Sequence, residues 1–297
     1  MNDYPLPALK VSIVIPVFND AAGVVDCLRS IAGQSYPPSS IEAIVVDNGS
    51  QPPLALDEQF PFNLKVLHHS KPGSYAARNA GVAASTGEVL AFTDADCVAQ
   101  PHWIEHGLNA LLGEDTRSVI GGEVRMATPD NPTATALYQS VVGFRQQENI
   151  ERRCFSVTAN LFCRRSDFDI VGPFNENLLS GGDLEWCWRA RAHGIPTTYA
   201  PDAIVDTSPR TTLRGAMRQA RRVAAGRLHL ARLASTASLP PGSMPRHGAL
   251  ASARWILGHP DLRPLERIQV LGVAAFIRLS AALESLRVRL GGIAERR

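Results

Sequence analysis

Short apolar runs that end in polar residues recur through the first hundred residues, and they constrain the fold more than any other feature of the chain. The runs cover residues 11–15, 43–46 and 89–92, and segments of helical character separate them. Apolar runs of this length between helices are typical of buried strands in a parallel sheet, joined by right-handed crossovers. The sequence therefore predicts an α/β fold with a mostly parallel central sheet flanked by helices.

The alternation of strands and helices continues beyond these runs. Helices are expected over residues 22–32, 75–84, 103–112, 134–147 and 182–193, and further strands over residues 64–67, 119–120 and 155–163. Arginines crowd another expected helix between residues 210 and 232, and prolines with a glycine predict a loop at residues 238–242. The chain has no internal repeat, and its 297 residues suffice for one large α/β domain with a smaller appendage.

Polar side chains follow three of the expected strands, at the point where each strand ends. Pro16, Phe18 and Asn19 follow the first strand, Asp47 the second, and the tetrad Thr93-Asp94-Ala95-Asp96 the run at residues 89–92. This edge of an open α/β sheet is where ligands bind. An Asp-x-Asp pair suits Mg²⁺ or Mn²⁺ bridging phosphates, although aspartate is also common in turns after strands. Because three neighbouring carboxylates repel one another without cations or donors among them, the pattern favours a nucleotide and metal site.

Composition and absent motifs exclude several classes of function. A net charge of +2 and the lack of a zinc-finger or RNP signature argue against a nucleic-acid partner. Neither a dinucleotide fingerprint nor a P-loop occurs, so metal and arginine must meet the phosphate charge. The five cysteines never fall in C-x-x-C spacing, which favours buried thiols in a reducing compartment. Residues 1–10 lack a signal-peptide pattern, so we expect a cytoplasmic location.

Taken in order, these motifs resemble the inverting family 2 glycosyltransferases of the GT-A fold. The resemblance rests on SIVIPVFN at residues 12–19, VVDNGS at 45–50, ARNAG at 77–81, TDAD at 93–96, TANLF at 158–162 and GGDLEWCWR at 181–189. No single motif is unique, but six motifs in register are highly specific. The resemblance implies a nucleotide-sugar-dependent glycosyltransferase domain over residues 1–225, and leaves residues 226–297 as a helical C-terminal extension.

The resemblance also implies a role for each strand-tip residue. The implied donor-binding residues are Pro16, Phe18, Asn19, Asp47, Arg78, Asp94 and Asp96, with Asp47 at the base or ribose of the nucleotide. Asp96 is the implied principal ligand of a divalent cation, Mn²⁺ or Mg²⁺, and Asp94 touches ribose or metal. Many relatives supply a further metal ligand, a histidine, after a later strand. Here Asp206 stands in that stretch, either as a ligand or as a turn residue before Pro209.

Asp183 is the implied general base, which takes the proton from the acceptor hydroxyl. The family usually opens this helix with Gly-Glu-Asp, and Gly182 here replaces the glutamate. We expect the helix N-terminus to keep the Asp183 carboxylate ionised, although the same position suits a plain helix cap. The residues expected around the acceptor or sugar pocket are Asn160, Glu185, Trp186 and Arg189. Trp186 is either a core residue or a sugar-stacking platform, and Arg189 is expected to bond a neighbouring carboxylate.

Residues 265–290 predict an amphipathic last helix. Its apolar arc carries Leu265, Ile268, Ala275, Phe276, Leu279, Leu283, Leu286 and Leu290. The longest charge-free run, residues 268–277, is shorter than the roughly 20 residues of a membrane-spanning helix, so we expect no crossing. The helix either docks on its own domain or a partner, or lies in a membrane interface.

The resemblance implies transfer of a single sugar from a nucleoside-diphosphate sugar, with UDP-sugars favoured, to a hydroxyl of a glycan or lipid-linked acceptor. A Gln-x-x-Arg sequence at residues 219–222 lacks the tryptophan and flanking membrane helices of processive synthases. Cell-envelope or exopolysaccharide synthesis is the expected setting, with peripheral contact at the inner face of the cell membrane through the last helix. Two alternatives stay open: a catalytically impaired nucleotide-sugar-binding protein, and a sugar nucleotidyltransferase.

Overall fold

The computed structural model describes residues 9–113, 117–236 and 248–294. The first eight residues of the N-terminal segment and the loop predicted at residues 238–242 lie outside the described residues. The chain divides into two compact units. Unit 1 comprises Met1–Val124, Gln146–Asn177 and Gly182–Thr207, and unit 2 comprises Arg125–Arg145, Leu178–Gly181 and Ser208–Arg297.

The boundary predicted at residue 225 falls inside unit 2, within helix α8 (Leu213–Thr236). The physical reason is that α8 packs along the last helix, α10 (Pro264–Arg289), and buries apolar side chains of its own there. Ala216 of α8, for example, is buried in one cluster with Val273 and Ile277 of α10. The arginine-rich helix therefore belongs to the C-terminal unit.

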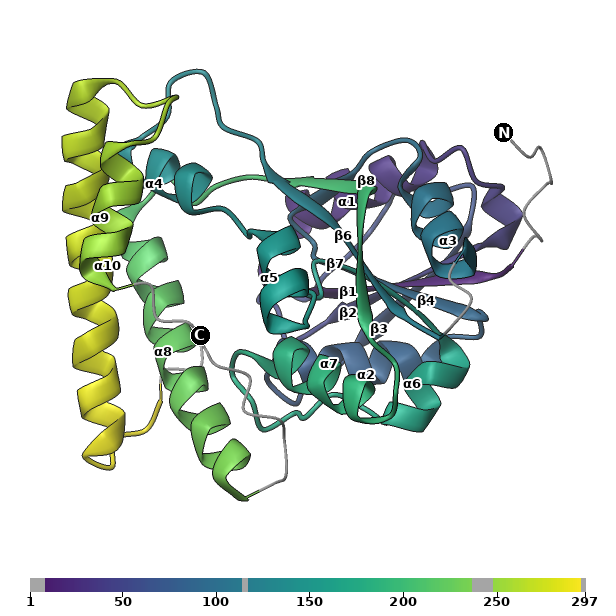
Figure 1. The fold of residues 1–297 in the computed structure, drawn as a ribbon. Helices are drawn as coiled ribbons and strands as arrows, with labels where there is room; N and C mark the ends of the chain where they lie inside the picture. The colour runs from purple at the N-terminus through teal and green to yellow at the C-terminus, as the bar shows by residue number, and fades with distance from the viewer. Residues whose placement is uncertain (1–8, 114–116, 237–247, 295–297) are drawn as a thin grey trace. The chain divides into compact units, whose positions relative to one another are not determined.

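An eight-stranded mixed sheet forms the centre of unit 1 (Figure 1). Its spatial order is β3-β2-β1-β4-β7-β6-β8-β5. The strands are β1 (Val11–Val17), β2 (Ile41–Asp47), β3 (Asn63–His68), β4 (Val89–Thr93), β5 (Cys97–Ala99), β6 (Val119–Met126), β7 (Asn160–Arg164) and β8 (Thr197–Thr207). The first four strands run parallel to one another, which confirms the predicted α/β fold. The pairs β4–β7, β6–β7 and β5–β8 are antiparallel.

Helices pack on the sheet through buried apolar side chains. Unit 1 contains α1 (Ala21–Ala32), α2 (Ser74–Ala84), α3 (Trp103–Gly113), α5 (Gln146–Arg153), α6 (Arg165–Val171) and α7 (Gly182–Ala192). Helix α2 lies especially close to the sheet, because a Cβ atom at Gly81 would lie 2.5 Å from the side chain of Val14. This close approach holds the arginine of α2, Arg78, next to the strand ends.

Two expected elements differ from the structure. The helix expected over residues 134–147 ends early as α4 (Ala134–Val142), and α5 follows as a separate helix. Gly143 and Arg145 have φ angles of 54° and 48°, and these left-handed conformations interrupt the helix. The first strand also extends through Val17, so that Pro16 lies within it and pairs with Val46.

Unit 2 consists of helices, namely α4, α8, α9 (Ala249–Leu257) and α10, among its described residues. Helix α10 contacts α4, α8 and α9 through Val270, Val273, Ala274 and Ile277. These residues lie outside the predicted apolar arc, whose leucines are exposed. By length and composition alone α10 also qualifies as a membrane-span candidate, with 33% of its most apolar window buried.

Candidate active site

The strand tips of unit 1 meet at one edge of the sheet, as the sequence predicts. Val17 at the end of β1 lies opposite Asp47 at the end of β2, and the two strands are parallel. β4 runs parallel to β1, and Asp94 follows directly after it. The side chains of Phe18, Asp47 and Asp94 therefore start from neighbouring positions at the carboxyl edge, where α/β sheets bind ligands.

Arg78 and Asp94 form an ion pair at this edge, with the Arg78 guanidinium donating to Oδ1 of Asp94. The Arg78 side chain is 4% exposed and that of Asp94 is 37% exposed. A guanidinium buried to this extent needs a carboxylate partner, because an unpaired buried charge is costly. The Arg78 guanidinium also stands 5.7 Å from the centre of the Tyr75 ring, one helical turn earlier in α2.

Asp183, on helix α7, lies in the same cluster. It is the second residue of α7, and its Oδ1 accepts hydrogen bonds from the Leu184 amide at 2.9 Å and the Tyr75 hydroxyl at 3.3 Å. Part of the carboxylate is accessible, yet surrounding protein atoms desolvate it and raise the pKa of Asp183. The Leu184 amide, the positive charge of Arg78 and the Tyr75 hydroxyl oppose this rise without cancelling it.

Burial raises the pKa of Asp183 more than the neighbouring hydrogen bonds and the charge of Arg78 lower it. That the helix N-terminus keeps Asp183 ionised stays a prediction. Asp183 is not a helix cap, because α7 begins at Gly182. A carboxylate with a raised pKa accepts a proton more readily, which suits a general base.

The structure explains why residue 182 is glycine, which the sequence does not reveal. A Cβ atom at this position would lie 2.7 Å from the Tyr75 ring, closer than side chains pack. Residue 182 is therefore glycine because the ring of Tyr75 fills the space where its side chain would begin. Sequence reasoning missed Tyr75, since an aromatic residue at the start of a helix reads as an ordinary core residue.

Asp47 is 1% exposed and bonds the loop that follows it. Its two carboxylate oxygens accept from the amides of Ser50 at 2.9 Å and Leu54 at 3.0 Å, and Nδ1 of His68 lies 3.2 Å away. Burial by itself raises the pKa of Asp47, but these hydrogen bonds more than offset it and lower the pKa. In this structure Asp47 shapes the loop at the strand tip, and its contact with a base or ribose stays a prediction.

The loop after β1 is bound to the loop after β2. The Asn19 amide donates to Oγ of Ser50 at 2.8 Å, and the Gln51 amide donates to Oδ1 of Asn19 at 2.8 Å. Asn19 adopts a left-handed φ of 53°, which asparagine tolerates well. Phe18 lies at the tip of this loop with its side chain partly exposed. These bonds preorganise the region in which the sequence predicts the base pocket.

The Asp94–Asp96 pair provides the oxygen ligands that a divalent cation prefers. Asp94 is partly buried, and Asp96 is exposed in the turn between β4 and β5. Within the described ranges, no group of three or more His, Cys, Asp or Glu side chains is arranged to hold a metal ion. The pair therefore fits a cation whose other ligands come from a diphosphate and water, because Mg²⁺ binds in this manner.

Asp206 does not join Asp94 and Asp96 as a third ligand, and this part of the predicted metal site is not supported. Asp206 lies opposite Val98 in the β5–β8 pair, and its carboxylate accepts from the side-chain amide of Gln100. Residues that face each other across two paired strands project to the same side of the sheet, and so do residues two positions apart in one strand. Asp206 therefore lies on the same side as Gln100, to which its carboxylate is bonded.

The residues expected around the acceptor or sugar pocket instead stabilise the fold. Asn160 is 0% exposed; its amide donates to the carbonyls of Glu123 and Ala203 and accepts from the Trp103 indole, all at 2.8 Å. Because this side chain is fully buried and its three bonds join parts of the fold, it cannot contact a sugar, and its expected role is wrong.

Trp186, Glu185 and Arg189 likewise have structural partners. Trp186 is fully buried against Phe168 and Phe174, which selects the core alternative over the stacking platform. The predicted carboxylate partner of Arg189 is Glu185, with Nε to Oε1 at 2.7 Å. Arg189 also donates to backbone carbonyls that precede α7, so the pair anchors this helix in position.

The parallel strands, the carboxylates at their tips and the arginine among them define the class of GT-A glycosyltransferases. Residues 12–169, more than half of the chain, match the family model described as Glycosyl transferase family 2. The chain therefore belongs to glycosyl transferase family 2, as the sequence motifs predict.

Two curated relatives extend this comparison. The chain is 40% identical over 199 residues to Glycosyltransferase AglE of Haloferax volcanii, a match that covers 65% of each chain. It is 34% identical over 212 residues to a Pre-mycofactocin glycosyltransferase of Mycobacterium tuberculosis, which covers 69% of this chain and 44% of the relative. The matches thus span less than two thirds of either relative's length.

Solved structures share the fold at low sequence identity. A mannosyltransferase of Pyrobaculum calidifontis in complex with GDP-Man and Mn²⁺ superposes with a TM-score of 0.59 at 18% identity, covering 96% of this chain and 81% of that one. TarS of S. aureus superposes with a TM-score of 0.52 at 15% identity, covering 94% and 55%. These likenesses confirm the GT-A fold.

Proposed function

We propose that this protein is an inverting glycosyltransferase that moves one sugar from a nucleoside-diphosphate sugar to an acceptor hydroxyl. The observation that carries the proposal is the position of two neighbouring residues of α2, Tyr75 and Arg78. Arg78 is paired with Asp94 and stands 5.7 Å from the centre of the Tyr75 ring. The Tyr75 hydroxyl bonds Asp183 at 3.3 Å, so α2 contacts both a donor carboxylate and a candidate base. Such an arrangement suits a reaction in which a diphosphate leaves from one face of a sugar and a hydroxyl attacks the other.

Asp183 is the general base in the proposed transfer step. Its carboxylate accepts the proton of the acceptor hydroxyl, and the hydroxyl oxygen forms the new bond to the anomeric carbon. The bond from that carbon to the diphosphate oxygen breaks, and its electron pair leaves with the diphosphate. Attack opposite the leaving group inverts the anomeric centre. Tyr75 acts as a positioning residue, because its hydroxyl holds Oδ1 of Asp183.

The same proposal includes a divalent cation, Mn²⁺ or Mg²⁺, with Asp96 as the principal ligand and Asp94 beside it. A cation bound there would neutralise the charge of the departing diphosphate. The exposure of Asp96 supports this assignment, because an incoming nucleotide can complete the coordination shell. The mannosyltransferase that shares the fold holds Mn²⁺ together with its donor.

The donor and the acceptor are proposed as classes. UDP-sugars are the first donors to test, followed by GDP-sugars, since the solved neighbours include complexes with UDP-GlcNAc and GDP-Man. The proposed acceptor is a glycan or a lipid-linked saccharide in cell-envelope or exopolysaccharide synthesis. The exposed leucines of α10 support an acceptor that is held at a membrane.

The deciding experiment compares Asp183→Asn with the wild-type chain. Hydrolysis or transfer from UDP-, GDP- and dTDP-sugars is measured with added Mn²⁺, and nucleotide affinity is measured by calorimetry. We expect Asp183→Asn to lose on the order of 10²- to 10⁴-fold in rate while nucleotide affinity stays near that of the wild type. Asp169→Asn, at an exposed position of α6, is the matched control and should keep the rate.

The result also separates the alternative functions. An impaired sugar-nucleotide-binding protein would bind the donors in calorimetry and give no Asp183-dependent turnover. A sugar nucleotidyltransferase would release pyrophosphate from a nucleoside triphosphate and a sugar phosphate. The chain lacks the glycine- and lysine-rich phosphate loop expected of that class, so we expect no pyrophosphate.

A further inference from the structure

An apolar stripe runs along the exposed side of α10 in unit 2. Its members are between 55% and 79% exposed: Leu265, Ile268, Phe276, Leu279, Leu283, Leu286 and Leu290. At 100° per residue these seven positions fall within an arc of about 80°, so they form one continuous stripe along the helix. A helix of 26 residues carries this stripe over about 39 Å. A stripe of that length is far larger than the scattered apolar residues of an ordinary surface.

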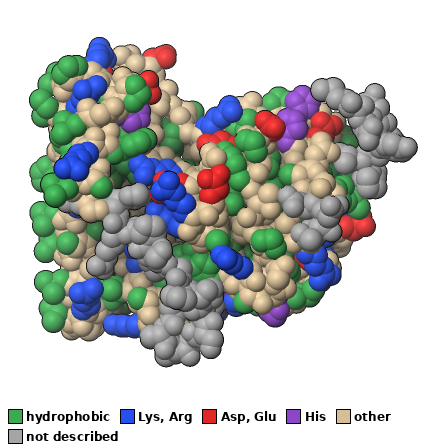
Figure 2. Space-filling model, in the orientation of Figure 1, with side chains coloured by type: hydrophobic (Ala, Val, Ile, Leu, Met, Phe, Trp, Pro, Cys, Tyr) green, Lys and Arg blue, Asp and Glu red, His purple; other side chains and the backbone are tan. Residues whose placement is uncertain are grey.

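The acidic and basic residues of α10 differ in how they lie relative to this stripe. Its two acidic residues, Glu266 and Glu284, have side chains only 16% and 3% exposed, and each is paired with an arginine. Arg267, Arg278 and Arg289 recur every eleven residues and therefore lie along one flank of the stripe. Figure 2 shows hydrophobic side chains over α9 and α10 with basic side chains between them. The accessible charge of this helix is therefore positive.

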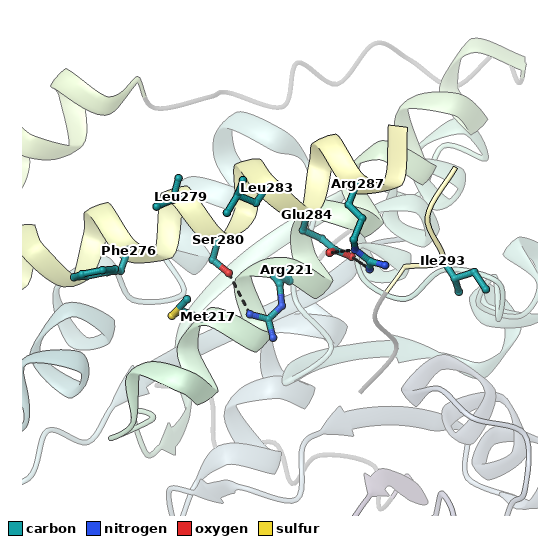
Figure 3. Close-up of a pocket in the computed structure, with 9 residues that line it drawn as sticks. All are labelled: Met217, Arg221, Phe276, Leu279, Ser280, Leu283, Glu284, Arg287 and Ile293. Carbon is teal, nitrogen blue, oxygen red and sulfur yellow. Dashed lines mark hydrogen bonds and ion pairs between the residues drawn. The ribbon is translucent and has the colours of Figure 1, made fainter. Parts of the chain in front are cut away.

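The opposite face of α10 packs against other helices of unit 2. Val270, Val273, Ala274 and Ile277 pack among α4, α8 and α9. The Oγ atom of Ser280 accepts from Arg221 of α8 at 3.2 Å, and Glu284 pairs with Arg287 (Figure 3). To span a bilayer, α10 would have to leave these partners and carry the charges of Glu284 and Arg287 into hydrocarbon, which is costly. The packing therefore favours a helix that lies on a membrane.

A groove extends the apolar stripe toward α8. Phe276, Leu279 and Leu283 form one wall, and Met217 and Ile293 contribute further apolar surface (Figure 3). The groove has a volume of about 620 Å³, and Arg221 and the Glu284–Arg287 ion pair lie beside its apolar wall. Apolar side chains next to guanidinium groups match the boundary between acyl chains and phosphate headgroups.

We propose that the exposed face of α10 binds the surface of an anionic phospholipid membrane, with the helix lying in the plane of the interface. The leucine stripe enters the acyl boundary, and Arg267, Arg278 and Arg289 face the lipid phosphates. This surface is independent of the transfer activity, because none of its residues belongs to the cluster around Arg78.

The test uses the full chain and vesicles made of phosphatidylcholine alone or of phosphatidylcholine with phosphatidylglycerol. Binding is followed by flotation at low and at high ionic strength. We expect binding to the anionic vesicles, weak binding to the neutral ones, and a loss of affinity as salt screens the arginines.

Variants separate the apolar and the basic parts of the surface. Ile268→Glu and Leu286→Glu should each reduce vesicle affinity by about tenfold or more, because each places a carboxylate in the stripe. Ile170→Glu, at an exposed apolar position of unit 1, is the matched control and should bind as the wild type does. Arg278→Gln with Arg289→Gln should reduce affinity by roughly fivefold per arginine, and Arg29→Gln on α1 should not.

Circular dichroism and Tm must show that each variant is folded, so that a loss of binding is not a loss of structure. Several outcomes overturn the proposal. Absence of vesicle binding does so, as does binding that ignores lipid charge and salt. A stable dimer in lipid-free solution that Ile268→Glu dissociates would assign the stripe to a second copy of the chain. Retention in membranes through alkaline carbonate washing would assign it to a spanning helix.

Discussion

The hydroxyl of Tyr75 lies 3.3 Å from Oδ1 of Asp183, and the ring of the same tyrosine fills the space beside Gly182. One residue of α2 thus positions the candidate base and requires glycine at the residue before it. Arg78, one turn further along α2, binds Asp94 at the end of the sheet. Helix α2 therefore organises both halves of the candidate site.

Replacing Tyr75 with phenylalanine keeps the ring and removes the hydroxyl. The hydrogen bond from Tyr75 favours the ionised form of Asp183, so its loss should raise the pKa of Asp183 further. A general base works only when ionised, and the acid limb of the pH profile of kcat should therefore move to higher pH. Tyr36→Phe, which removes a hydroxyl bonded to the Leu9 carbonyl, is the control. An unchanged profile in Tyr75→Phe would contradict the positioning role.

Adding one methyl group at Gly182 should force the Tyr75 ring or α7 to move. Gly182→Ala is expected to lower stability by about 1–3 kcal/mol, the usual cost of overpacking, and to reduce kcat by displacing Asp183. Tm and steady-state kinetics measure the two effects. Gly272→Ala in α10 meets no atom within 4 Å, so it should keep or slightly raise Tm. Equal behaviour of the two variants would show that the contact at Gly182 is unimportant.

Arg78→Met should leave the Asp94 carboxylate without its partner. We expect a loss of at least 10-fold in kcat/KM and a stability decrease of about 1–3 kcal/mol, reduced from a fully buried pair because Asp94 is partly exposed. Steady-state kinetics measures kcat/KM, and thermal unfolding measures the stability. Arg29→Met removes an exposed surface ion pair with Glu58. It should leave kcat/KM unchanged and lower stability by no more than a few tenths of a kcal/mol.

The metal assignment predicts a contrast between Asp96 and Asp206. Asp96→Asn should raise the Mn²⁺ concentration required for half-maximal activity by on the order of 10- to 100-fold. Asp206→Asn should leave it unchanged, because Gln100 holds that carboxylate. The opposite ranking would return Asp206 to the ligand set. Full activity of the wild type in a chelator would remove the cation from the reaction.

Glu42 predicts a pH dependence of stability that is separate from catalysis. Burial raises its pKa, but hydrogen bonds from Lys65, Ser12 and the Thr86 amide outweigh it and lower the pKa to about 2 from 4.5. The folded pKa lies below the unfolded one, so the stabilisation is complete above about pH 4.5 and is lost as pH falls toward 2. That difference corresponds to about 3 kcal/mol. Chemical denaturation of the wild type between these pH values should show this loss of stability. Glu42→Gln should not lose stability in this way as the pH falls. Glu151→Gln, an exposed control, should behave as the wild type does.

Local sequence patterns were sufficient to predict the positions of Asp47, Asp94 and Asp96. Each follows an apolar strand, and parallel strands present their carboxyl ends at one edge, so strand order in the sequence places these residues together. The same reasoning failed for Asn160 and for Asp206 as a metal ligand, and it left the role of Trp186 open. Burial, a hydrogen bond to Gln100 and aromatic packing, respectively, assign these three side chains to the fold.

The amphipathic pattern of α10 was likewise only partly predictable from the sequence. The sequence revealed the apolar arc, because the arc depends only on the period of a helix. It did not reveal that Val270, Val273 and Ile277 would pack inside unit 2 and leave the leucines exposed, since that choice depends on which neighbours α8 and α4 offer.

The sequence by itself determined the family, the parallel strands and the acidic strand tips, because these follow from short-range patterns along the chain. Only the tertiary structure decided that Tyr75 and Arg78 would stand between Asp94 and Asp183. Asp183 follows Tyr75 by 108 residues in the chain, and their meeting depends on the close packing of α2 against the sheet at Gly81 and against α7 at Gly182. Long-range packing of this kind leaves no periodic signal in a single sequence.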